Sequence, residues 1–455
     1  MRSPRVLALA LALAPTTISA ALPMAARAQA AARAASPAAG AGLSLNDAVS
    51  LALSHNRDVI AAKMEIEAAE LEVVAARIYP NPTLQYGIAN LVLGNANPQM
   101  GAVTSSPHVF GQAVQSLGIG EIVDVWSKRS ARARAAARGV DQRRFLTEDV
   151  LREIVYAVRS AFEDVLRAQA ERDMAKEVAA RYAETVRLSQ ARFRAGDIAE
   201  SELRKVELEG LRNQNAVLDS ELQLDVGRHN LAALLGLGAG DLPGDHLIEP
   251  DLRSAFDREQ LIATALEHRP DLKAAGAAQV AGQARLTAAQ REAYPDLTLG
   301  ATYTHSAFTV SGDNPNSLAL TLGLPLPLFD RNQANIGRAR LDIRHAENDS
   351  ARLRLAVEND VTEAVLRAQR SRTLLAVFQR PGADASATAT SDPGGMLARA
   401  ETALKVAEKS YKAGAISLLE LLDAQRTYLD TRGQYLRVLH DSRQAAIDVA
   451  HAVGE

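Results

Sequence analysis

The stretch at residues 316–341, NSLALTLGLPLPLFDRNQANIGRARL, decides the fold. From Leu318 to Leu328 every even position is leucine, and the odd positions are alanine, threonine, glycine or proline. This period of two predicts a strand with one apolar face and one small or polar face. The Pro-Leu-Phe-Asp sequence at 327–330 ends the strand, and helical spacing follows. We therefore expect a two-faced strand that leads into a long helix.

The composition excludes several classes of function. The chain has 455 residues, a net charge of -3 and no cysteine, so disulfides, zinc–thiolate sites and thiol catalysis are excluded. A near-neutral chain lacks the basic face that nucleic acid requires. The nine histidines form no HExxH motif or pair at metal-ligand spacing, and no phosphate-binding glycine loop follows a strand. We expect no enzyme activity, no cofactor, no metal site and no nucleic-acid partner.

The N-terminus has the pattern of a secretory signal. Arg2 and Arg5 precede an apolar segment at 6–14, and Ala28 and Ala30 form a small-x-small cleavage pattern. We expect a signal peptide at residues 1–30 and a flexible leader at 31–43. The rest of the chain has no apolar run of about 20 residues, which a transmembrane helix needs. If the mature protein spans a membrane, it must therefore do so as a barrel.

The mature chain is expected to alternate between very long helices and short strands. Helical patterns cover residues 44–78, 126–196 and 199–235, and strand patterns cover 83–94 and 112–123. A helix over 126–196 would be roughly 100 Å long, at 1.5 Å per residue. No compact domain accommodates such a length, so the molecule should be elongated.

The sequence then repeats itself. LALSHNRD at 51–58 resembles TALEHRPD at 264–271, and FRAGDI at 193–198 resembles YKAGAI at 411–416. The same order of elements in each half indicates an internal duplication. We predict one repeat at 44–240 and a second at 241–455. Residues 381–395 are rich in proline, glycine, alanine, serine and threonine and have no counterpart in the first repeat, so they are expected to form a loop insertion.

Four strands cannot close a useful barrel, and open edges are not tolerated in lipid, so the strands imply oligomerisation. At this point the chain resembles the outer-membrane factor family, the TolC-like exit ducts of tripartite efflux and secretion systems. The resemblance covers residues 45–449 and rests on the duplication, on RPDL at 269–272 and on the two helix turns. It implies a mainly α protein with long coiled-coil hairpins and four strands per protomer. Three protomers would share a transmembrane β-barrel, continued by a periplasmic helical tunnel.

The sequence LPLPLFDRNQ at 324–333 resembles the cobalt–zinc–cadmium resistance subgroup of that family. This resemblance implies a passive exit duct for heavy-metal cations in the cell outer membrane. The implied partners are a homotrimer, a periplasmic adaptor (membrane fusion) protein, an inner-membrane RND-type pump and outer-membrane lipid. Two alternatives remain: a duct for drugs or type I secreted polypeptides, and a periplasmic coiled-coil structural protein without a barrel.

The resemblance also implies two sets of site residues at the helix tips. The tips would contact the adaptor through Phe193, Ala195, Gly196, Asp197 and Ile198 in the first repeat, and through Ala413, Gly414, Ala415 and Ile416 in the second. The alternative is that these segments are only turns, in which glycine supplies the left-handed conformation.

A periplasmic gate is expected beside the tips, again by resemblance. Its residues would be Glu202, Tyr411, Glu420 and Asp423. Threefold repetition of the carboxylates would concentrate negative charge and attract cations. Glu420 and Asp423 are three residues apart and share one helix face. The alternative is an ordinary solvated acidic face of a coiled coil.

Overall fold

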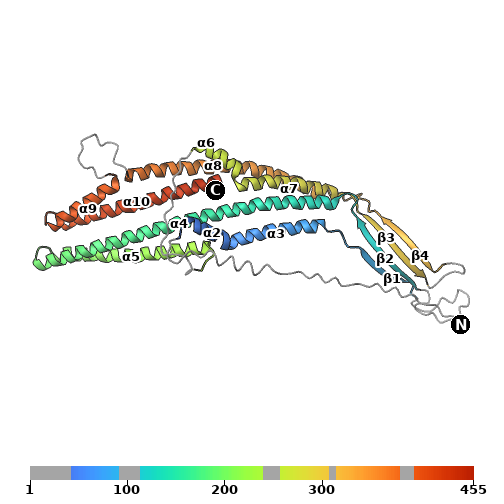
Figure 1. The fold of residues 1–455 in the computed structure, drawn as a ribbon, viewed down its shortest axis with the longest axis horizontal. Helices are drawn as coiled ribbons and strands as arrows, with labels where there is room; N and C mark the ends of the chain where they lie inside the picture. Colours follow the sequence, from blue (N-terminus) through green and yellow to red (C-terminus); the bar gives the residue numbers. More distant parts are fainter. Residues whose placement is uncertain (1–42, 92–112, 239–256, 307–313, 380–393) are drawn as a thin grey trace.

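The computed structural model describes residues 43–91, 113–238, 257–306, 314–379 and 394–455. The molecule is elongated, with a sheet at one end and two helical hairpins at the other (Figure 1). The first repeat contains α2 (Leu45–His55), α3 (Arg57–Arg77), β1 (Thr83–Ala89), β2 (Val114–Val123), α4 (Lys128–Ala195) and α5 (Glu200–Leu234). The second contains α6 (Arg258–His268), α7 (Pro270–Glu292), β3 (Leu297–Ser306), β4 (Asn316–Gly323), α8 (Gln333–Gln379), α9 (Met396–Lys412) and α10 (Leu418–Val453).

The four strands form one antiparallel sheet in the order β1-β2-β3-β4. In its register Leu318 pairs with Tyr303, Tyr303 with Leu117, and Leu117 with Tyr86. Paired residues share a face, so the leucines of β4 continue across the sheet as one apolar face. The opposite face carries small and hydroxyl side chains, one row of which is Thr83, Gly120, Gly300 and Thr321. The two-faced character of the predicted strand is confirmed, but the strand is shorter than expected: β4 ends at Gly323, and residues 324–328, with Pro325 and Pro327, lie outside it.

The long helices are also confirmed. Helix α4 has 68 residues, which corresponds to about 100 Å. It turns at Gly196 into α5, and α9 turns at Gly414 into α10, as Figure 1 shows. Among the described residues, no helix combines the length and the apolar character needed to cross a membrane.

Each repeat has its own apolar core, where short helices dock onto a long hairpin. In the first repeat α2 packs on α4 and α5 around Phe162 and Leu231, both fully buried. In the second repeat α6 packs on α8 and α10 around Val361 and Val449. The two cores are built from equivalent elements, which confirms the duplication at the level of packing.

In each repeat, a residue at the equivalent position donates a hydrogen bond to a carbonyl near the end of the second helix of the hairpin. We call this second helix, α5 or α10, the return helix. Asn56 donates from Nδ2 to the carbonyl of Leu234, near the end of α5, at 2.8 Å. Arg269, at the aligned position, donates from Nη1 to the carbonyl of Ala452, near the end of α10, at 3.3 Å. The final carbonyls of a helix have no partner within it, so these contacts satisfy groups that would otherwise lack one. We call Asn56 and Arg269 the clamp residues.

The Asn56 clamp corrects one expectation. The helix expected over 44–78 is broken into α2 and α3, because the Asn56 side chain accepts the N–H groups of Asp58 and Val59 and starts a new helix. Strand β1 also ends earlier than the expected residue 94. It stops at Ala89, and Asn90 has a positive φ of 59°, which does not continue a strand.

Several predicted segments fall outside the described residues. They are the signal peptide, all of the leader except Leu43, and most of the insertion at 381–395. The two ends of the insertion meet: a Cβ on Gly395 would lie 2.2 Å from the carbonyl oxygen of Phe378. Helices α8 and α9 therefore follow each other closely in space, as a loop extruded from one long helix requires. The bounds of the repeats and of the insertion stay predictions.

Gly236 and Gly196 provide a matched test of the clamp region. Both have a positive φ, of 70° and 82°, so alanine costs each of them about 1 kcal/mol. A Cβ on Gly236 would lie 2.4 Å from the carbonyl oxygen of His55, whereas one on Gly196 meets nothing within 4 Å. We expect Gly236→Ala to lower the thermal midpoint, followed by circular dichroism, clearly more than Gly196→Ala. Equal effects would show that α5 is not held against His55.

Candidate functional site at the hairpin tips

The two helical turns lie at the end of the molecule farthest from the sheet (Figure 1). Gly196 and Gly414 occupy the left-handed region, with φ of 82° and 75°. Both turns have the same backbone hydrogen bonds. The N–H of Gly196 donates to Phe193 at 3.0 Å, and the N–H of Gly414 donates to Tyr411 at 3.0 Å. The repeated sequence therefore builds two copies of one turn, each closed by glycine.

The two tips pack against each other rather than standing apart. Val206 of α5, Tyr411 of α9, and Leu418 and Leu421 of α10 form one buried apolar cluster. Ile416, predicted as an adaptor contact, packs partly buried against it. The structure thus brings together the ends of both hairpins within a single protomer.

Tyr411, predicted as a gate residue, is almost completely buried, with 2% exposure. The guanidinium carbon of Arg192 lies 4.4 Å from the centre of its ring, and Arg192 Nη2 donates to its backbone carbonyl at 2.7 Å. The Ser189 hydroxyl is 3.4 Å from the Tyr411 hydroxyl. In this structure Tyr411 joins the two hairpins. Arg192, which the sequence prediction did not select, is its main partner.

The predicted gate carboxylates are all exposed, but their surroundings differ. Glu420 forms a capping box with Ser417: its Oε2 accepts the Ser417 N–H at 2.9 Å, and its own N–H donates to the Ser417 hydroxyl at 3.3 Å. Glu202 occupies the same third position of helix α5, where the N-cap residue Ala199 has no side-chain acceptor. Asp423 lies exposed three residues after Glu420. Glu420 thus has a structural role as well as the predicted one.

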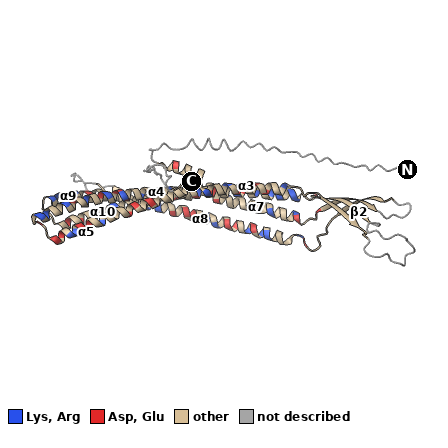
Figure 2. Cartoon of the chain, turned by 90° about the horizontal axis from the view of Figure 1, so that it is seen from below, with Lys and Arg blue, Asp and Glu red and all other residues tan. Residues whose placement is uncertain are grey.

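Most of the predicted adaptor-contacting residues are accessible. Phe193 is 39% exposed. Six further predicted residues are exposed, and Ile198 is partly buried; the six are Ala195, Gly196, Asp197, Ala413, Gly414 and Ala415. Figure 2 shows basic and acidic residues intermingled around these turns. The tips therefore offer small residues, one aromatic ring and both signs of charge.

A polar seam joins the two hairpins behind the tips. Helices α4 and α10 run antiparallel, and a series of hydrogen bonds and ion pairs connects them, beside apolar residues such as Leu166 and Leu439. The pairs, ordered from the middle of the molecule toward the tips, are Tyr156–Asp448, Ser160–Gln444, Asp164–His440, Glu177–Arg432 and Thr185–Gln425. We call this the α4–α10 seam. Local sequence patterns did not reveal it, because each pair joins residues far apart in the chain.

The seam contains a buried carboxylate. Glu163 is 1% exposed, its Oε1 has no hydrogen-bond partner among the described residues, and its Oε2 lies 3.8 Å from Arg443 Nη1. Burial raises the pKa of the Glu163 carboxyl, and Arg443 opposes that shift. The hydrogen bond to Asp164 raises the pKa of His440. The seam therefore holds groups whose charge responds to pH.

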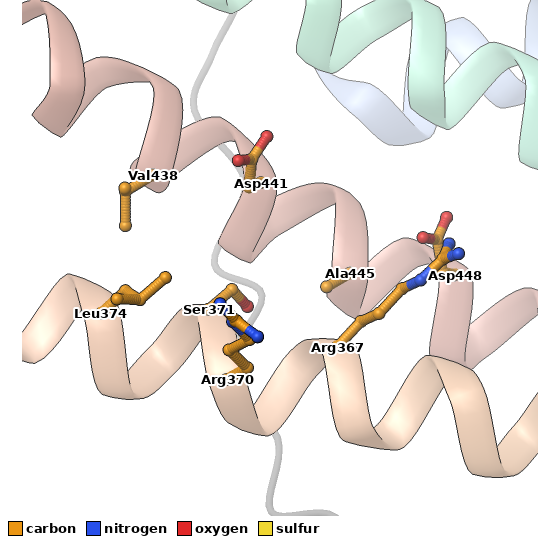
Figure 3. Close-up of a pocket in the computed structure, with 8 residues that line it drawn as sticks. All are labelled: Arg367, Arg370, Ser371, Leu374, Val438, Asp441, Ala445 and Asp448. Carbon is orange, nitrogen blue, oxygen red and sulfur yellow. The ribbon is translucent and has the colours of Figure 1, made fainter.

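A groove of about 320 Å³ lies between α8 and α10 (Figure 3). Its walls are mixed in character, with Arg367, Arg370, Ser371 and Leu374 on α8 and Val438, Asp441, Ala445 and Asp448 on α10. Throughout the described ranges, no group of three or more histidine, aspartate or glutamate side chains is arranged to hold a metal ion. The described lining of the groove therefore lacks the donor set of a metal site.

Comparison with known proteins identifies this arrangement. The family model described as outer membrane efflux protein matches residues 48–237 and again residues 261–455. Cobalt-zinc-cadmium resistance protein CzcC of Cupriavidus metallidurans is 27% identical over 414 residues, which cover 90% of each chain. Pyoverdine export outer membrane protein OpmQ of Pseudomonas putida is 26% identical, over 90% of this chain and 85% of the relative.

A solved structure has the same fold. The crystal structure of CusC superposes with a TM-score of 0.70 at 19% identity, over 90% of this chain and 92% of the other. The sheet, the long helices and the hairpins of this chain all lie within the two family matches. Since those matches cover most of the chain, this protein belongs to the outer membrane efflux protein family.

Proposed function

We propose that three copies of this chain form a passive exit duct for divalent heavy-metal cations across the outer membrane. A periplasmic adaptor and an inner-membrane RND-type pump would deliver the cations to the tips. One observation supports heavy-metal cations as the cargo: a cobalt–zinc–cadmium resistance protein is 27% identical to this chain over 90% of its length. The LPLPLFD sequence at 324–330, where the sheet meets α8, resembles that subgroup and supports the proposal.

The chemistry of the sheet suits such a duct. One face presents leucine and tyrosine, and the other presents glycine, serine and threonine. The first suits lipid and the second suits a water-filled lumen. Strands β1 and β4 each have a single neighbour in this sheet, so both of its edges are open. Edge-to-edge assembly of three copies would pair these edges in one closed barrel.

The helical part would provide the periplasmic tunnel and its gate. In a threefold assembly the carboxylates Glu202, Glu420 and Asp423 would each occur three times around the entrance. A ring of carboxylates attracts cations and raises their local concentration. The chain supplies no energy in this scheme, because the pump drives transport. The predicted tip residues would meet the hairpins of the adaptor.

The α4–α10 seam is the part of the protomer best suited to yield when the gate opens. Each apolar core lies within one repeat, so separating α4 from α10 leaves both cores intact. The seam pairs are polar, and water replaces a polar contact at a small net cost. We infer that gate opening separates α4 from α10 along the seam and breaks the tip cluster around Tyr411, while the clamp residues stay in place.

The relative named as a pyoverdine export protein supports a second cargo. It is 26% identical over 90% of this chain, close to the value for the metal-resistance relative. A duct for exported small organic molecules is therefore the second candidate. It shares the architecture and the gate with the first and differs only in what the pump delivers.

The cargo predicts a growth phenotype. Deletion of the gene from its host should lower tolerance to zinc, cobalt and cadmium, because the exit route is lost, and should leave antibiotic tolerance unchanged. Minimal inhibitory concentrations measure both, and a plasmid-borne copy of the full chain serves as the control. Unchanged metal tolerance together with lower antibiotic tolerance would favour the second cargo.

The gate predicts a change in conductance. Glu420→Gln with Asp423→Asn removes two charges per protomer, and glutamine at the third helical position keeps the capping box. We expect planar-bilayer recordings to show higher conductance and weaker block by zinc or cobalt ions, with an unchanged thermal midpoint.

Glu347→Gln with Asp342→Asn is the matched control, since both residues are exposed on α8 outside the tips. It should leave the cation block as in the wild type. Loss of the block in both double variants would mean that overall charge, rather than charge at the tips, controls the current.

The seam predicts a pH-dependent stability. The raised pKa of His440 means that its contact with Asp164 contributes fully below the ordinary value of 6.5 and is lost as pH rises through the raised value. We therefore expect His440→Gln to lower the thermal midpoint more at about pH 6 than at about pH 9. Burial lowers the pKa of His451, so the effect of His451 on stability has the opposite pH dependence. His451 is present in both the wild type and the variant, so its effect cancels in the difference between their thermal midpoints. A pH-independent difference would exclude a charged His440 in the seam.

A further inference from the structure

Each of the four junctions between the sheet and the helices carries one exposed aromatic residue. The junction residues Tyr79, Trp126, Tyr294 and Phe329 are 61%, 39%, 47% and 92% exposed. Trp126 stacks on Tyr294 with ring centres 5.0 Å apart, which joins the first repeat to the second. The four residues belong to the connections between the strands and α3, α4, α7 and α8. All four connections lie at the same end of the sheet (Figure 1).

Each junction also carries an arginine within three residues of its aromatic side chain. They are Arg77, Arg129, Arg291 and Arg331. Within the described ranges, none of the four has a carboxylate partner. The neighbouring cations differ, because Lys128 pairs with Asp296 and Arg132 pairs with Glu292. We call the four aromatic and four arginine residues the junction collar. Figure 2 shows both basic and acidic residues at the helix ends that face the sheet, where α7 ends at Glu292.

The first-repeat part of the junction collar is ordered by its own contacts. The guanidinium carbon of Arg129 lies 3.6 Å from the centre of the Tyr79 ring. Arg129 donates to the Tyr79 hydroxyl at 2.5 Å and to the carbonyl of Arg77 at 2.9 Å. A guanidinium has five N–H donors, so others stay available for an external acceptor. The Arg129 side chain is therefore held in position, and no carboxylate among the described residues pairs with its guanidinium.

These features match one partner. Tyrosine and tryptophan favour the boundary between hydrocarbon and water, and arginine binds phosphate through two parallel hydrogen bonds. Exposed Leu326 and Leu328 place apolar surface beside Arg331. We propose that the junction collar binds the phosphate head groups of phospholipids at the periplasmic face of the membrane that holds the sheet. Because the four arginines bring positive charge without a counter-charge, it selects anionic phospholipid over zwitterionic phospholipid.

The depth of the junction collar can be measured directly. This proposal rests on the proposed function for the presence of a membrane, and Trp126 is the only tryptophan of the chain. The full chain is reconstituted into vesicles of phosphatidylethanolamine and phosphatidylglycerol that carry quenchers either at the head group or deep in the acyl chains. We expect stronger quenching of Trp126 fluorescence by the head-group label. Quenching by aqueous iodide alone would overturn both the collar and the membrane placement.

The role of the arginines needs a second measurement. Arg77→Gln, Arg291→Gln and Arg331→Gln are combined, and Arg129 is kept because it contacts Tyr79. Native mass spectrometry then counts the lipids retained from vesicles of phosphatidylglycerol and phosphatidylcholine. We expect the wild type to retain phosphatidylglycerol in preference to phosphatidylcholine. The triple variant should retain roughly fivefold less phosphatidylglycerol than the wild type, or less still. Retention of phosphatidylcholine should not change.

A matched control separates local binding from net charge. Arg194→Gln, Arg426→Gln and Arg437→Gln remove the same charge from exposed positions on the hairpins, away from the sheet. This variant should retain phosphatidylglycerol as the wild type does. An equal loss in both variants, or displacement of the lipid by free inorganic phosphate, would refute the collar. If retention is unchanged in the collar variant while Trp126 stays at head-group depth, the arginine proposal fails and the proposed function stands.

Discussion

The rest of the molecule depends on the hydrogen bonds that Asn56 and Arg269 donate to the ends of the return helices. A hairpin of two long helices fixes its own turn, but its last carbonyls lie inside the protein and need donors. Asn56 and Arg269 supply them and also begin helices that lead toward the sheet. Arg269 is held in turn by Asp271 and Asp360, so this buried charge is neutralised. One residue per repeat thus connects the hairpin to the strands.

This arrangement produces two kinds of helix contact with different mechanical properties. Contacts within a repeat bury valine, leucine and phenylalanine, and separating them would expose apolar surface. Along α4 and α10 the repeats are joined by a series of hydrogen bonds and ion pairs, and Glu163 is buried there with Oε1 lacking a partner among the described residues. The repeats also pack against each other through α4 and α7 nearer the sheet. At the tips they are joined by the apolar cluster around Tyr411.

The fold could be predicted from sequence wherever one local pattern decides a structure. The alternating leucines of 318–328 predict the sheet faces, and the glycines at 196 and 414 predict the turns. The break at Asn56 escaped prediction because that segment contains neither proline nor glycine; its counterpart in the second repeat carries Pro270, at the first position of α7. At the site, the contact between Arg192 and Tyr411 joins residues 219 apart, and no local spacing encodes it.

The duplication also distinguishes the two gate carboxylates that sequence reasoning treated alike. Glu202 and Glu420 both occupy the third position of a return helix, where the helix dipole favours negative charge. The two N-cap residues differ, since Ser417 can complete a capping box and Ala199 cannot. The Glu420 carboxylate therefore divides its hydrogen-bonding capacity between the cap and any passing ion, whereas Glu202 has no side-chain partner among the described residues. If the predicted carboxylate ring binds cations, loss of Glu202 should therefore affect binding more, and helix stability less, than loss of Glu420.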